Sequence, residues 1–131
     1  MTTSTALSSE WLAMVLGSLG RTGDEVAQSL RQGGMTGIPS DVWDDPVATY
    51  VRTLTRALVA PDSLVAVMVT TDDVAISTIG ATLDPGDYQE VLVETPGPVE
   101  DFIDRFDAGE DYQDLARGTL LGARSADCRR R

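Results

Sequence analysis

Residues 64–69 read LVAVMV, residues 74–79 read VAISTI and residues 90–94 read EVLVE. The first two runs are separated by a polar break at 71–73, and the third follows the turn sequence DPGD at 84–87. Short apolar runs divided by turn-forming residues predict the three strands of an antiparallel meander. Because every residue from 64 to 69 is apolar, we expect this run in the middle of the core, with helices packed against it.

Four other segments carry apolar residues at helical spacing. We expect helices over about 9–20, 22–32, 46–60 and 97–109. Thr22 and Glu25 have the order of a capping box, and Asp45-Pro46 reads as an N-cap followed by the first helical residue. The sequence therefore predicts an α+β fold, a three-stranded antiparallel β-meander packed with about four helices.

The loop before the third predicted helix is rich in glycine, proline and aspartate. It contains Gly37 and Pro39, and we expect Ile38 and Trp43 to pin it to the body. Tryptophan is more often a core residue than a ligand contact. Trp43 is nevertheless the residue to watch for a partner, because aspartates surround it and one face could stay open.

Length and composition favour one folded unit. The chain has 131 residues and 42% hydrophobic content, which is enough for a core of its own. We expect a flexible N-terminus (1–8), a single α+β domain (9–117) and a flexible arginine-containing tail (118–131). Neither a membrane span nor a secretory signal is recognisable, so we expect a cytoplasmic protein. The single cysteine, Cys128, excludes an internal disulfide.

Acidic residues dominate the charge, and they are unevenly placed. The formal net charge is −11, and between Asp84 and Asp114 only Arg105 opposes the acids. Nucleic acids and anionic membranes require a cationic face, so neither is expected to bind the body directly. A basic partner or simple solubility is favoured instead.

Residue types missing from the chain exclude the common nucleophilic mechanisms. The chain has no histidine and no lysine, and its one cysteine lies in the tail. Ser-His, Cys-His and Ser-Lys arrangements therefore cannot be built. Paired carboxylates of the glycosidase kind are conceivable, but a solvated acidic face explains the same residues more simply. We therefore expect no enzymatic activity and no cofactor.

Two acidic segments and one glycine-spaced segment are candidate sites for bound ions. Asp41, Asp44 and Asp45 are close enough in sequence to bind a hard cation, although turn and capping roles are the simpler interpretation. A calcium loop started at Asp107 puts Tyr112 where a glycine is required, so that match fails. The glycine-spaced segment 17–23 lacks the lysine of a phosphate-binding loop, and it is more simply interpreted as the end of one helix and the start of the next.

Two segments carry a resemblance to a known group of proteins. The sequence GMTGIPSD (34–41) followed by PVATYV (46–51), and the sequence FIDRFDAG (102–109), resemble patterns in small uncharacterised actinobacterial and actinophage proteins. The resemblance implies an origin and a fold, and no activity. Those proteins tend to have a cysteine and a proline at two positions where this chain has Asp45 and Gln113.

Taken together, these features predict a non-enzymatic regulatory protein, phage- or prophage-encoded, that binds a host or phage protein with a basic surface in the host cytoplasm. The candidate partner-binding residues are Trp43, Asp44, Glu100, Asp101, Asp104 and Asp107. Two alternatives stay open: a DNA mimic that inhibits a nucleic-acid-binding protein, and a virion or assembly accessory protein. Since a three-stranded sheet leaves edges to protect, we also expect a homodimer.

Overall fold

Three strands form one antiparallel sheet in the order β1-β2-β3. They are β1 (Leu64–Val69), β2 (Asp73–Ile79) and β3 (Gln89–Glu94). The computed structural model describes residues 7–109 and 111–116. The predicted flexible tail and all but the last two residues of the predicted flexible N-terminus lie outside these ranges. The predicted meander is confirmed.

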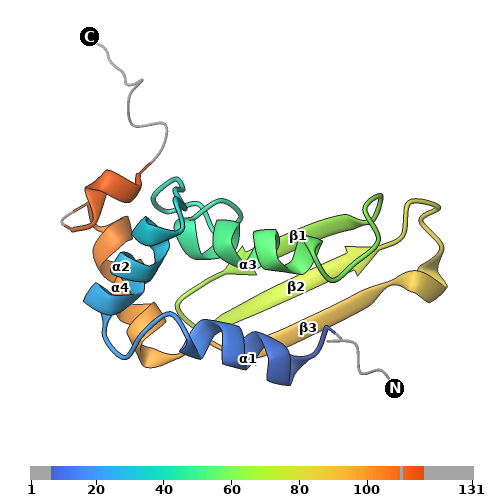
Figure 1. Cartoon of the computed structure of the whole chain (residues 1–131), viewed down its shortest axis with the longest axis horizontal. Coiled ribbons are helices and arrows are strands. Elements are labelled where there is room, and N and C mark those ends of the chain that lie inside the picture. The colour runs from blue at the N-terminus through green and yellow to red at the C-terminus, as the bar shows by residue number, and fades with distance from the viewer. Residues whose placement is uncertain (1–6, 110, 117–131) are drawn as a thin grey trace, which may run out of the picture.

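Four helices and two short 3-10 turns complete the described part of the chain. They are α1 (Ser9–Gly17), α2 (Gly23–Gln32), α3 (Pro46–Arg56), η1 (Pro85–Asp87), α4 (Gly97–Asp107) and η2 (Gln113–Leu115). Figure 1 shows α1 and α3 lying on the same side of the sheet, with α2 and α4 beside each other at one end of it. The predicted α+β class is confirmed.

Side-chain caps explain where α1 and α2 begin. Ser8 Oγ accepts a hydrogen bond from the Trp11 N–H, and Thr22 Oγ1 accepts one from the Glu25 N–H, both at 3.1 Å. These bonds satisfy backbone donors that have no partner within the helix. The first helix ends at Gly17 rather than near Gly20, and Leu19 reaches the core from the connection that follows.

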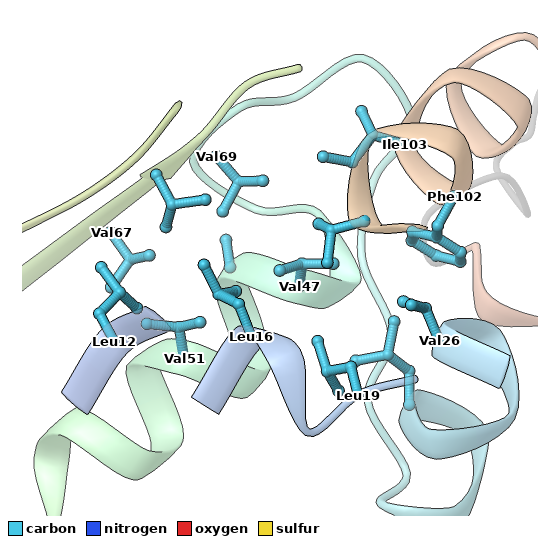
Figure 2. Close-up of a cluster of buried hydrophobic side chains, with 14 of the residues drawn as sticks. Leu12, Leu16, Leu19, Val26, Val47, Val51, Val67, Val69, Phe102 and Ile103 are labelled. Carbon is cyan, nitrogen blue, oxygen red and sulfur yellow. The ribbon is translucent and has the colours of Figure 1, made fainter. Parts of the chain in front are cut away.

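The core lies between the sheet and the helices that cover it. Figure 2 shows Leu12 and Leu16 of α1 and Val51 of α3 pointing toward Val67 of β1. All four side chains are at most 1% exposed. A second part of the same cluster joins α2 to α4, where Phe102 is fully buried.

The expectation that residues 64–69 occupy the middle of the core is wrong. The central strand is β2, and β1 lies at an edge with Leu64 57% exposed. Residues 70–72 and 80–88 each connect one strand to its antiparallel neighbour, so the second run lies between the other two. The buried side chains Val67 and Val69 face the helices, whereas Leu64, Ala66 and Met68 alternate toward the other face.

Candidate functional site

Trp43 lies in the loop between α2 and α3, and it is 55% exposed. Ile38 is 37% exposed, so the prediction that these two side chains pin the loop is wrong. Backbone hydrogen bonds hold the loop instead. The Ile38 N–H donates to the Asp44 carbonyl at 2.7 Å, and the Gly37 N–H donates to the Leu115 carbonyl at 3.0 Å.

Gly37 fixes this loop against the start of α3. A β-carbon at Gly37 would lie 2.4 Å from backbone atoms of Asp44, Asp45 and Pro46, which is closer than any side chain can approach. On its other side Gly37 forms a parallel bridge to Ala116. The loop backbone is therefore clamped between α3 and the segment that follows η2, and only glycine fits there.

Charged side chains hold both peptide groups of Trp43. Asp41 Oδ1 accepts a hydrogen bond from the Trp43 N–H at 3.0 Å, and Arg52 Nη1 donates one to the Trp43 carbonyl at 3.1 Å. Arg52 also lies 3.6 Å from a carboxylate oxygen of Asp44. The main chain of Trp43 is thus fixed while its indole stays largely in solvent.

Asp45 has a structural role at the start of α3. It is 2% exposed, and its Oδ1 accepts a hydrogen bond from the Ala48 N–H at 2.7 Å. Burial raises the pKa of this carboxyl from 3.8 to about 7, and the nearby charges of Asp107 and Asp41 act in the same direction. The turn and capping roles predicted for the aspartates of this loop are therefore present. Within residues 7–109 and 111–116, no three acidic, histidine or cysteine side chains are grouped to hold a metal ion.

Helix α4 carries the other predicted partner-binding residues. Glu100, Asp101 and Asp104 are exposed on its outer side, opposite the buried Phe102 and Phe106. At 1.5 Å per residue, Glu100 and Asp107 lie about 10 Å apart along the helix axis.

Asp107 connects α4 to the loop that carries Trp43. Its Oδ1 accepts a hydrogen bond from the Ser40 N–H at 2.8 Å. The structure thus brings Asp107 and the Trp43 loop together, while Glu100 lies toward the other end of α4.

Arg105 gathers several of the acids that the sequence leaves without an obvious partner. It lies 3.4 Å from Asp24, 3.3 Å from Asp101 and 2.8 Å from Asp111. Its guanidinium also stacks 4.8 Å above the ring of Tyr112, whose hydroxyl donates to Asp24 at 2.6 Å. Part of the acidic charge is therefore already neutralised within the molecule, and Asp101 is engaged internally.

Two contacts between α2 and the chain after α4 shift pKa values. Partial burial, followed by the hydrogen bond to Asp24, raises the pKa of the Tyr112 phenol above its ordinary value. A bidentate contact from Arg31, at 2.6 and 3.1 Å, lowers the pKa of the Asp114 carboxyl. Both contacts tie the chain after α4 to α2.

The sequence did not lead us to predict that the second face of the sheet carries exposed apolar side chains. Leu64 and Leu92 are 57% and 58% exposed there, and Tyr88 is 50% exposed. A shallow hollow of about 160 Å³ lies at one end of the sheet, between Leu64, Ile79 and Tyr88. The available signal was the placement of Glu90 and Glu94 on one face of the strand and of Val91 and Val93 on the other, which is typical of a strand with one face in solvent.

Comparisons of the chain with protein-family models, curated proteins and solved structures give no match. Among the described residues, no helix has the length and apolar character needed to cross a membrane.

Proposed function

We propose that this protein is a non-enzymatic interaction protein that binds a basic surface of another protein, with Trp43 at the centre of the contact. The observation that carries the proposal is the presentation of Trp43, whose peptide N–H and C=O are both held while the indole is 55% exposed. Tryptophan is enriched among the residues that dominate binding energy. A fixed backbone also lowers the ordering cost of binding.

Acidic side chains near this loop specify the charge of the partner. Asp107 connects the loop to α4, and Glu100 and Asp104 add exposed carboxylates along the same helix. Asp44 contributes through its contact with Arg52, so it sets the local geometry as well as the charge. A partner with basic residues around an apolar pocket is complementary to this surface.

DNA mimicry receives less support from the same contacts. A mimic needs carboxylates free to replace phosphates, but Asp101 and Asp111 are engaged by Arg105, and Asp114 is engaged by Arg31. We therefore favour binding of a basic protein surface through Trp43 over mimicry of DNA. A phage or prophage origin, a cytoplasmic location and a homodimer stay predictions.

The test is co-purification from a lysate of the native host, using the tagged native chain and its Trp43→Ala variant. Met14→Ala is the matched control, since Met14 is 63% exposed but lies on α1. We expect Trp43→Ala to weaken binding about 30-fold or more, the effect of losing a contact worth about 2 kcal/mol. Met14→Ala should retain the partner, and circular dichroism should show all three proteins folded.

Equal recovery of the partner by native protein and Trp43→Ala would contradict the proposal. Recovery of DNA-binding proteins, with a steep loss at high salt, would favour DNA mimicry instead. A stoichiometric band of this chain in purified virions would favour the assembly role.

A further inference from the structure

Strand β3 has an outer edge whose peptide groups point away from the sheet. The Thr95 N–H donates to the Asp72 carbonyl at 3.0 Å, which fixes the hydrogen-bonding phase of the β2–β3 ladder. Peptide groups alternate in direction along an antiparallel strand, so Val91 and Val93 bond to β2. The N–H and C=O groups of Glu90, Leu92 and Glu94 therefore point outward.

The opposite edge of the sheet differs, because β1 is partly closed. The Val69 N–H, which also points away from β2, donates to the Val42 carbonyl at 2.8 Å. Its neighbour with the same orientation, Val67, is only 1% exposed. The three outward-pointing residues of β3 are all exposed, and Leu92 reaches 58%. Val65, the remaining outward residue of β1, is half-buried, so β3 is the more accessible edge in the described part of the sheet.

Side chains along this edge form an acidic, apolar, acidic row. Glu90, Leu92 and Glu94 share the sheet face opposite α1 and α3, which no helix in the described part of the chain covers, and successive members lie about 7 Å apart. Glu94 lies opposite Asp73, which adds a third carboxylate to the same face. Among residues 7–109 and 111–116, no arginine forms an ion pair with Glu90 or Glu94.

We propose that β3 accepts an extended segment of a partner protein as a fourth strand, with a basic, apolar, basic alternation facing Glu90, Leu92 and Glu94. This inference rests on the proposed function and adds a mode of binding to it. Main-chain hydrogen bonds to the free edge supply affinity, and the alternating side chains supply selectivity. The two kinds of contact have the same two-residue period, so one strand satisfies both.

The charge pattern argues against a second copy of this chain as the occupant. Two β3 strands paired antiparallel about a two-fold axis at Leu92 would place Glu90 of each copy opposite Glu94 of the other. Like charges directly opposite one another destabilise a strand pair. The acidic residues of β3 thus disfavour self-pairing along this edge but do not oppose a basic strand, and the predicted homodimer would have to form through another surface.

The first experiment uses a fluorescein-labelled peptide, TRTVTRT, and a matched peptide, TETVTET, with the native chain labelled with nitrogen-15. We expect binding of the arginine peptide with a Kd below about 1 mM and binding of the glutamate peptide at least about tenfold weaker. On titration, the amides of Glu90, Leu92 and Glu94 should shift and become protected from hydrogen exchange. The inward amides of Val91 and Val93 are already bonded and should gain little protection.

Two variants separate the backbone contacts from the charges. Leu92→Pro removes an outward N–H without removing a ladder bond to β2, and should abolish detectable peptide binding. Glu90→Gln with Glu94→Gln keeps the edge intact and should weaken binding about fivefold, with less dependence on salt. The double variant remains informative if Leu92→Pro does not fold.

The control variant is Glu25→Gln with Asp62→Asn, which removes the same number of charges from exposed positions on α2 and before β1 and should bind the arginine peptide as native protein does. Absence of peptide binding at about 1 mM would overturn the inference. Equal loss in the control and β3 charge variants, or protection confined to residues outside β3, would also overturn it. Loss of a host partner in Trp43→Ala tests the proposed function separately, because that variant leaves β3 unchanged.

Discussion

Replacing Asp45 with asparagine should change how the stability of the protein depends on pH. Asp45 is 2% exposed and caps α3 through the Ala48 N–H, and burial raises its pKa from 3.8 to about 7. Asparagine is as good an N-cap as aspartate and stays neutral. Asp45→Asn therefore keeps the cap and removes the titration.

The sign follows from where the proton is bound. Between about pH 4 and 7 the Asp45 carboxyl is protonated in the folded state and ionised in the unfolded state. The folded state binds the extra proton, so this residue's contribution is fully present below the unfolded pKa and is lost as pH rises through the folded pKa. At 1.36 kcal/mol per pKa unit, the contribution changes by about 4 kcal/mol across this window.

The assay is urea unfolding, followed by circular dichroism, at a series of pH values from 4 to 8. We expect the free energy of unfolding of Asp45→Asn, relative to native protein, to rise by about 4 kcal/mol across this range. At pH 4 the variant should be the less stable protein, because a buried amide has donors that need partners. Asp45→Ser, a second neutral cap, should show the same change with pH. Parallel curves for the native and variant proteins would refute the reasoning.

Three further predictions concern the packing around the site, each measured as the free energy of unfolding in urea. Gly37→Ala should destabilise the protein by about 2 kcal/mol or more, because the new methyl group meets the backbone of 44–46. The control Gly17→Ala, whose methyl group would have nothing within 4 Å, should be neutral or stabilising. Equal effects of the two substitutions would contradict the clamping of the loop at Gly37. Phe102→Ala should cost about 3–5 kcal/mol, since Phe102 is fully buried, and a loss below about 1 kcal/mol would show that it is not packed as described. Asp114→Asn should lower the free energy of unfolding by less than about 1 kcal/mol, because this carboxylate is 53% exposed. The loss of stability should be complete above the ordinary pKa of aspartate and should vanish as pH falls through the lowered pKa of Asp114. A loss that persists in acid would exclude the ion pair with Arg31 as its cause.

Much of the fold could be predicted because it depends on residues close together in the chain. The capping pairs are read from neighbouring positions, and Asp45 caps α3 as its position before Pro46 indicates. Turn residues between short apolar runs are enough to predict a meander. Apolar content was a poor guide to depth, however, since Leu64 belongs to the most apolar run and is 57% exposed.

The candidate site was predicted only in part, because its contacts join distant segments. Asp107 was recognised as an exposed acid, but its bond to Ser40 connects positions far apart in the sequence. Arg105 was counted as one charge, whereas the structure places Asp24, Asp101 and Asp111 around it. No local pattern indicates which carboxylates a single arginine will neutralise.

By itself, the sequence determined the kinds of element, their order and their caps, since these follow from residue periodicity and from hydrogen bonds within one or two turns. Only the tertiary structure decided which acids remain available, that Trp43 faces solvent and that β3 carries the more accessible edge. Those outcomes depend on which face of the sheet the helices cover and on how the chain folds back on itself. They arise from contacts between residues that are distant in sequence and adjacent only in space.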